Sequence, residues 1–157
     1  VMGVSTYDYN DSGKSGVIMF NNKIKLELLK EQEKVAELNS IISSINNSVA
    51  TIEFFPDGKI ITANTLFLQT VGYELDDIEG QHHSIFCSKE YSSSSEYATF
   101  WSNLSSGLLQ KGSVERRDKN GNVLWLEATY FPIKRDGKVV KVMKIVSDIT
   151  QQYMKSE

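Results

Sequence analysis

The sequence KNGNVLWLEATYFPI, at residues 119–133, decides the fold because a tight turn leads directly into a long strand. Gly121 supplies the positive φ that such a turn needs. One face of the strand carries Leu124, Leu126, Ala128, Tyr130 and Pro132, and the other carries Trp125, Glu127, Thr129 and Phe131. This period of two indicates a strand that packs one face against a core.

The same period continues on both sides of this strand. Residues 112–117 alternate before the turn, and a second turn at residues 136–137 leads into a last strand at 139–149. Earlier in the chain, residues 49–55 and 59–63 form two strands around a Pro-Asp-Gly turn. Strands joined by such short turns are antiparallel. The sequence therefore predicts a five-stranded antiparallel sheet.

Between the second and third strands the pattern changes to several short helices. Asn64 is a suitable N-cap for the first helix, and Gly72 ends it. Residues 74–79 and 81–86 form two more short helices, and a longer helix ends at Gly107. Two strands, several helices and three further strands predict an α+β fold with the helices on one face of the sheet.

The N-terminal part of the chain has a different character. Residues 1–18 are rich in Ser, Gly, Asp and Asn, which predicts a flexible leader. Residues 19–47 contain neither Pro nor Gly, and apolar residues recur in steps of four and three. They are Ile24, Leu28, Val35, Leu38, Ile42, Ile45 and, just beyond this range, Val49, with Glu31 interrupting the series at one inner position. This stripe predicts a signalling helix that dimerises as a coiled coil, or one that packs on its own domain. The folded domain is expected at 48–150, and residues 151–157 begin a C-terminal connector.

Composition excludes several classes of protein. The 157 residues include 17 basic and 20 acidic residues, with no basic stripe, so a nucleic-acid binder is not expected. The densest basic cluster, Arg116, Arg117 and Lys119, is interrupted by Asp118, and we interpret it as a solvated hairpin. The single cysteine, Cys87, fits a reducing compartment. No apolar run approaches the roughly 20 residues that span a bilayer, so a cytoplasmic location is expected.

Residues 49–150 resemble a PAS domain in the order of their motifs. The opening strand with its Asp-Gly turn is followed by ANTLFLQTVGY, by an acidic helix ending in GQHH, by KNGNVLWLEATYFPI and by a closing SDIT. More narrowly, EGQHHSIFC, EYATFW and YFPI are similar to the PAS domains of soluble methyl-accepting chemotaxis and aerotaxis-type receptors. The resemblance implies a bacterial sensor that binds a small ligand or cofactor and signals to a downstream domain.

The candidate cofactors are haem and FAD, and a domain without cofactor is the alternative. His83 is the candidate axial ligand for haem, although it could instead hydrogen-bond its own short helix. For FAD, Trp101 matches a tryptophan of the aerotaxis group, while Cys87 and Ser88 stand where that group carries Arg and His. The residues expected to line the pocket are His83, Trp101, Phe67, Phe86, Ile85 and Trp125. An ordinary aromatic core is the competing interpretation.

Metal and enzyme sites are not expected. His83 and Cys87 share a spacing of four, but zinc needs four ligands, or three and a water, and no further Cys or His besides His82 exists. A light-sensing flavin–cysteine adduct is not expected either, because Cys87 lies in FCSKEY rather than in a motif like NCRFL. No nucleophile–base pair stands out. We therefore expect no catalysis by this chain.

The end of the last strand carries the element expected to couple the domain to its output. Asp148 and Thr150 belong to a DIT sequence that, in the family it resembles, joins the last strand to an outgoing helix. A plain strand end with a helix cap is the alternative. Besides the chemotaxis sensor, two further functions remain: a cofactor-free dimerising adapter, and the input domain of a histidine kinase or cyclase.

Overall fold

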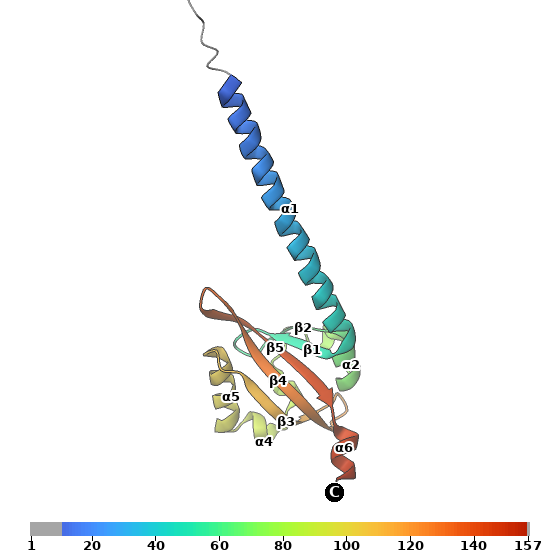
Figure 1. Cartoon of the computed structure of the whole chain (residues 1–157). Coiled ribbons are helices and arrows are strands. Elements are labelled where there is room, and N and C mark those ends of the chain that lie inside the picture. Colours follow the sequence, from blue (N-terminus) through green and yellow to red (C-terminus); the bar gives the residue numbers. More distant parts are fainter. Residues whose placement is uncertain (1–10, 157) are drawn as a thin grey trace, which may run out of the picture. The chain divides into compact units, whose positions relative to one another are not determined.

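In the computed structural model, which describes residues 11–156, five strands form one antiparallel sheet. The strand order is β2-β1-β5-β4-β3 (Figure 1). The strands are β1 (Ala50–Phe54), β2 (Ile60–Ala63), β3 (Gln110–Arg117), β4 (Val123–Arg135) and β5 (Lys138–Asp148). The first and last strands of the sequence pair at the centre, so β5 connects the two halves of the sheet. The predicted α+β fold is confirmed.

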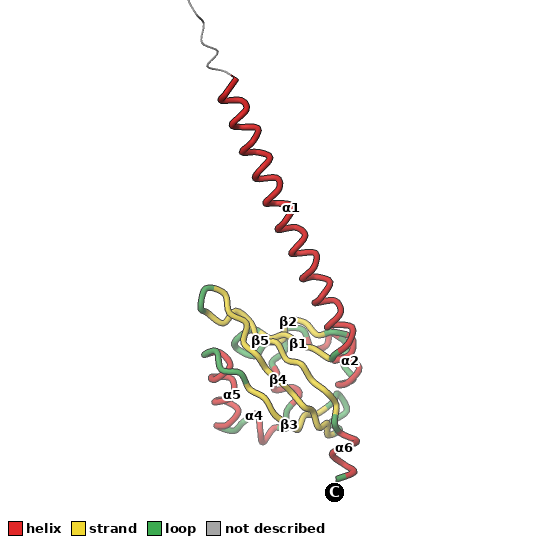
Figure 2. The backbone as a smooth tube through the Cα atoms, viewed as in Figure 1, coloured by secondary structure: helices red, strands yellow, loops and turns green. Residues whose placement is uncertain are grey.

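The segment between β2 and β3 is helical, as predicted (Figure 2). Its elements are α2 (Thr65–Val71), α3 (Leu75–Ile78), the 3-10 helix η1 (His83–Phe86), α4 (Lys89–Ser92) and α5 (Ser95–Ser105). A final helix, α6 (Thr150–Lys155), follows β5. Buried residues of α2, α3, η1 and α5 pack with buried strand residues in one core. The helices between β2 and β3 therefore cover one face of the sheet, which we call the inner face.

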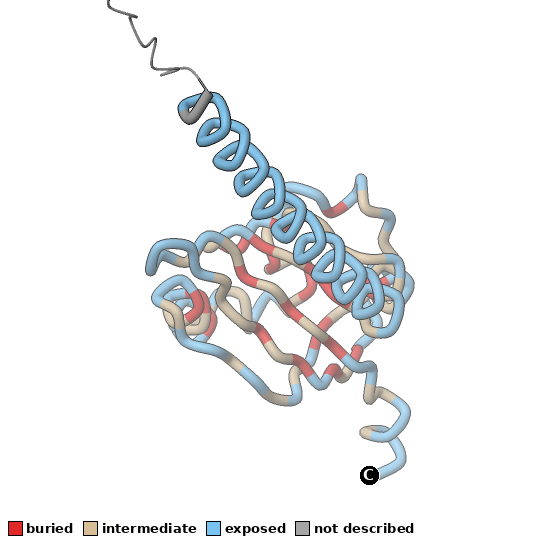
Figure 3. Tube along the Cα trace, turned by 45° about the horizontal axis from the view of Figure 1, so that its top comes forward, coloured by how far each residue is buried: buried red, intermediate tan, exposed pale blue. Residues whose placement is uncertain are grey.

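Alternation along β4 decides which side chains enter this core. Leu124, Leu126, Ala128 and Tyr130 are buried, whereas Glu127 between them is exposed. Figure 3 shows buried stretches along the strands of the sheet, while α1 is exposed. On β5, Val142, Lys144 and Val146 are buried in the same way. The buried Lys144 is unusual because a charged side chain is almost never fully buried without a partner.

Asn64 holds the start of α2 to β1. Its side-chain oxygen accepts hydrogen bonds from the backbone N–H groups of Phe67 and Thr51, and its amide donates to the carbonyl of Val49. Gly72, at φ 76°, ends the helix in the left-handed region that favours glycine. These are the cap and the end that the sequence predicted.

The N-terminal helix α1 spans Asp11–Ser48, which is longer than the sequence indicated. The flexible leader expected over 1–18 is therefore wrong for residues 11–18, while residues 1–10 lie outside the described part of the chain. Gly13 and Gly16 each cost about 1 kcal/mol relative to alanine, but extending an existing helix is cheap once it is nucleated. The apolar stripe of α1 is exposed at Ile24, Leu28 and Leu38.

Candidate functional site

A buried histidine lies at the centre of the inner face. The turn before it is fixed because the Nδ1 atom of His82 accepts a hydrogen bond from the backbone N–H of Ser84, which caps η1. His83 then points into the core with no exposed surface. Its Nδ1 lies 2.8 Å from the hydroxyl of Tyr97 on α5, and its Nε2 lies 3.0 Å from the hydroxyl of Tyr130 on β4. Both ring nitrogens are therefore engaged.

Arg116 extends this arrangement to β3. Its Nη2 donates to the hydroxyl of Tyr130 at 3.1 Å, and its Nη1 donates to the backbone carbonyl of Glu115 at 2.7 Å. The result is a continuous hydrogen-bonded series, Tyr97–His83–Tyr130–Arg116, which we call the polar chain. Because arginine only donates, Tyr130 accepts from Arg116 and is free to donate to Nε2 of His83. When Tyr130 donates in this way, the proton of His83 lies on Nδ1 and points toward Tyr97.

Lys144 lies on the other side of Tyr130. Its ammonium is 4.7 Å from the centre of the Tyr130 ring and 5.7 Å from that of Phe67. The Nζ atom has no hydrogen-bond partner, and the side chain has no exposed surface. Cation–π contacts of this kind recover part of the cost of burying an ammonium, but they do not replace a carboxylate.

The charges of this interior shift the pKa values of its members. Burial, together with the positive charges of Lys144 and Arg116, holds the pKa of His83 well below its usual value, so its imidazole is neutral. Burial and Arg116 likewise hold the pKa of Lys144 well below the usual value of a lysine. Burial raises the pKa of Tyr130 to about 12, so its hydroxyl stays protonated. The polar chain is therefore neutral at every member except Arg116.

Most of the residues expected to line a pocket do lie together. Phe86 packs edge-on against Phe67 at 5.5 Å, and His83 packs edge-on against Trp101 at 5.4 Å. Ile85 is partly buried against the same core. Their closeness is as expected, while their role in binding remains a prediction.

Trp125 does not belong to this group. It lies on the opposite, outer face of the sheet and stacks on Tyr153 of α6, with ring centres 3.9 Å apart. The prediction that Trp125 lines the pocket is therefore corrected. The physical reason is the alternation of β4, which turns Trp125 away from its buried neighbours Leu124 and Leu126.

The described geometry does not fit haem or a flavin well. Iron would need a free ring nitrogen of His83, and both nitrogens are engaged by tyrosine hydroxyls. An isoalloxazine ring would have to separate Phe67, Phe86 and Trp101, which lie in one packed core with His83. Cys87 lies with its Sγ 3.7 Å from Nδ1 of His83, and burial raises the pKa of its thiol. Within residues 11–156, no cluster of three or more metal-ligating side chains occurs.

The junction after β5 is tied to the neighbouring strand. Thr150 donates its backbone N–H to the carboxylate of Asp148, and its hydroxyl accepts from the backbone N–H of Trp125. Thr150 is the first residue of α6, and Ile149 occupies the N-cap position without a side-chain cap. The helix cap was the alternative interpretation of this strand end; in the structure Thr150 instead bridges β5 to β4. The stacking of Tyr153 on Trp125 holds the next turn of α6 on the same strand.

The sequence interpretation missed several residues of this site. The interpretation of Arg116 as part of a solvated hairpin is wrong, because the residue is only 3% exposed. Its alternation with Val114 along β3 was the signal that could have found it. Lys144 lies within the predicted last strand, but its burial without a partner is not evident from the sequence. Tyr97 and Tyr130 gave no local sign of a shared partner, because they lie 14 and 47 residues from His83.

Comparison with known proteins places this geometry in a family. The model of the family described as "PAS domain" matches residues 47–151. The chain is 37% identical over 117 residues to the biofilm dispersion protein BdlA of Pseudomonas aeruginosa, covering 74% of this chain and 28% of that protein. It is 32% identical over 93 residues to the aerotaxis receptor of Escherichia coli, covering 59% of this chain and 18% of the receptor. The chain thus spans less than a third of either relative.

Solved structures share the fold at low identity. The PAS domain of a protein from Colwellia psychrerythraea has a TM-score of 0.62 at 21% identity, covering 73% of this chain and 98% of that one. A light-oxygen-voltage domain studied with a flavin analogue has a TM-score of 0.61 at 18% identity, covering 74% and 90%. At these identities the likeness concerns the fold alone. No helix among the described residues is long and apolar enough to cross a membrane.

Proposed function

Because this chain belongs to the PAS domain family, we propose that it is the sensory module of a bacterial chemotaxis-type signal transducer. It binds a small ligand and passes the change to a downstream signalling domain through α6. The two curated relatives support the chemotaxis context by their names and identities. Those names describe biofilm dispersion and aerotaxis rather than a reaction, and we propose that this chain is not an enzyme. A cytoplasmic location belongs to the same proposal.

The observation that carries this proposal is the position of β5. The strand places the buried Lys144 in the interior and Asp148, four residues later, at the junction with α6. Lys144 is paired in register with Tyr130 of β4, and Asp148 with Leu126 of the same strand. A change in the contacts of Lys144 can therefore affect the outgoing helix α6 through β5 alone.

Hydrogen exchange of α6 tests this coupling. We expect Lys144→Met, which removes the interior charge, to slow exchange of the amides of residues 150–155 on the order of tenfold, about 1.4 kcal/mol in local opening. The physical reason is that β5 then packs in one arrangement and holds the junction more firmly. The matched control is Lys141→Met, on the outer face of the same strand, where the lysine pairs with Glu53.

Equal exchange of residues 150–155 in both variants and the unaltered chain would contradict the coupling. It would favour the alternative function, a cofactor-free adapter that holds its neighbours together without responding. The geometry favours a small colourless ligand over haem or FAD, since His83 would have to leave both of its partners to bind iron. The input domain of a histidine kinase or cyclase would use the same coupling with a different output.

A second part of the proposal concerns α1. We propose that its exposed stripe pairs with that of a second copy as a two-helix coiled coil. The stripe supports this because Ile24, Leu28 and Leu38 keep the spacing of such a seam, while charged residues surround them. Deletion of residues 11–44, followed by measurement of the mass in solution, tests it. We expect a dimer to become a monomer, and an unchanged mass would remove α1 from the interface.

A further inference from the structure

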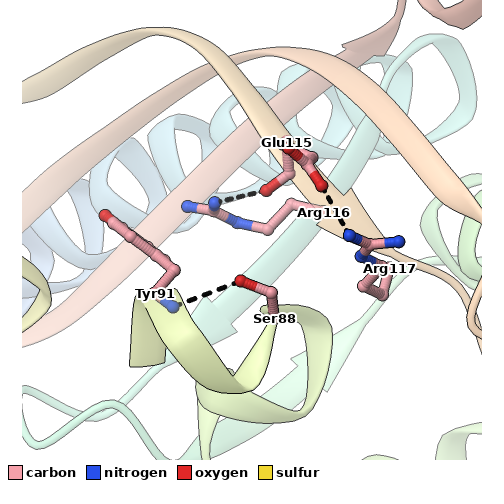
Figure 4. Close-up of polar contacts among 5 residues, drawn as sticks. All are labelled: Ser88, Tyr91, Glu115, Arg116 and Arg117. Carbon is pink, nitrogen blue, oxygen red and sulfur yellow. Dashed lines mark hydrogen bonds and ion pairs between the residues drawn. The ribbon is translucent and has the colours of Figure 1, made fainter. Parts of the chain in front are cut away.

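A hollow on the surface of the domain is lined by Arg116, one of the two cations buried in the described part of the chain. It lies between α4 and β3 and has a volume of about 270 Å³. Figure 4 shows four of its lining residues, with the guanidinium of Arg116 turned toward Tyr91. The lining residues are Ser88, Tyr91, Ser113, Val114, Glu115 and Arg116. Pockets for drug-sized ligands usually begin at about 300 Å³, so this hollow suits a smaller molecule.

Arg116, which lines this hollow, lacks one hydrogen-bond partner and a counter-ion among the described residues. It is 3% exposed, its two terminal nitrogens each make one hydrogen bond, and its Nε–H has no partner. Buried charges in proteins are normally paired, because an isolated one costs several kcal/mol. Among residues 13–156 no aspartate or glutamate is buried. The guanidinium therefore lacks a counter-ion within the described chain.

Glu115, which also lines the hollow, does not supply the missing counter-ion. Glu115 points to the outer face, where its Oε1 lies 2.7 Å from Nη2 of Arg117 (Figure 4). Only the backbone carbonyl of Glu115 reaches Arg116. Arg117 neutralises the carboxylate of Glu115. The negative charge of Glu115 therefore does not prevent an anion from approaching Arg116. The buried Lys144, whose Nζ lies 4.7 Å from the centre of the Tyr130 ring, adds positive charge to the same interior.

We propose that this hollow binds a small organic acid whose carboxylate pairs with the guanidinium of Arg116. The proposal rests on the proposed sensory function and names the class of its ligand. A carboxylate accepts two parallel N–H bonds from an arginine fork. The Nε–H is available to supply one of them. The ring of Tyr91 and the side chain of Val114 supply an apolar wall for the rest of the molecule.

The polar chain connects the bound acid to residues in the core. A carboxylate on Arg116 competes with the hydroxyl of Tyr130 for the guanidinium, so the bond between Arg116 and Tyr130 lengthens or breaks. Tyr130 is also the partner of His83 and lies against Lys144. Binding at the surface hollow thus changes the contacts of η1, α5 and β5 together, and β5 leads to α6.

Titration of the purified chain with acetate, succinate and inorganic phosphate, at constant ionic strength, tests the proposal. We expect saturable binding of succinate or acetate, with a shift of the NMR signal of the Arg116 Nε–H. Arg116→Gln should weaken binding at least about tenfold, which is the size of one lost charge-assisted hydrogen bond. The control Arg117→Gln, next in the chain but on the outer face, should bind as the unaltered chain does.

Three results would overturn the proposal. They are no saturable binding of either organic acid, binding of phosphate alone, and equal binding by Arg116→Gln and the unaltered chain. If Arg116→Gln does not fold, the NMR signal of the Arg116 Nε–H in the unaltered chain tests the proposal instead. A signal that does not shift when the acid is added excludes Arg116 as the binding partner of the acid. The outcome is separable from the proposed function, because Lys144→Met can alter exchange in α6 whether or not an organic acid binds.

Discussion

On the outer face of the sheet, Lys141 lies 2.7 Å from a carboxylate oxygen of Glu53, and Arg117 lies 2.7 Å from one of Glu115. On the inner face, Lys144 and Arg116 are buried without an acidic partner among the described residues. The two faces are built from the same strands, and β3 and β5 contribute a cation to each. The outer cations are therefore neutralised where they stand, and the inner ones are not.

We interpret the paired cations of the outer face as contributing to solubility, and the unpaired cations of the inner face as available to a ligand. An exposed ion pair contributes at most about 1 kcal/mol, and its loss is easily tolerated. A buried cation without a partner lowers stability, so replacing it with an apolar residue is often stabilising. A protein that keeps two such cations beside its central tyrosine gives up stability that binding of an anion can restore.

The largest expected effect that sharpens this comparison is the dependence of stability on pH. The pKa values of His83 and Lys144 are depressed in the folded state. Unfolding therefore takes up protons over the range between the folded and the unfolded pKa of each group, which ends at about pH 6.5 for His83 and at about pH 10.4 for Lys144. Stability rises with pH wherever the unfolded chain binds more protons. Lowering the pH from about 7 to about 5 should thus reduce the free energy of unfolding by about 2 kcal/mol through His83 alone, whose pKa in the unfolded chain is about 6.5.

Urea unfolding at a series of pH values measures this effect. His83→Gln removes one of the two groups and should give a shallower slope below about pH 6.5. If the unaltered chain and His83→Gln lost stability with the same slope, the neutral, buried state of His83 would be wrong. Acidic groups on the outer face are common to both chains, so they do not affect the difference.

The sequence predicted the strands and helix caps better than it predicted which polar and aromatic side chains lie in the core. Alternation over residues 119–133 and the cap at Asn64 depend on neighbours in the chain, and both are correct. Arg116 was misread because the charges beside it suggested a solvated hairpin, although every second residue of β3 faces the core. Trp125 was placed in the pocket against the alternation that set it opposite Leu124. In both cases the residue type was given more weight than the period.

The polar chain is a different kind of omission. Tyr97, His83 and Tyr130 come from α5, η1 and β4, and their hydroxyl and ring atoms meet only after the helices pack on the sheet. No spacing in the sequence encodes such a meeting. The coupling residues Asp148 and Thr150 were found by family resemblance, but the bond from Trp125 to Thr150 crosses between two strands and required the structure.

The stability of Lys144→Met and Lys141→Met, measured side by side by urea unfolding, tests most directly whether the inner face holds charge that the fold does not compensate. We predict opposite signs. Lys144→Met should raise the free energy of unfolding by about 1 kcal/mol, because it removes a buried, unpaired ammonium and keeps the apolar stem. Lys141→Met should lower it by about 0.5 kcal/mol, because it breaks the ion pair with Glu53. A loss of stability in Lys144→Met as large as that in Lys141→Met, or larger, would contradict the account.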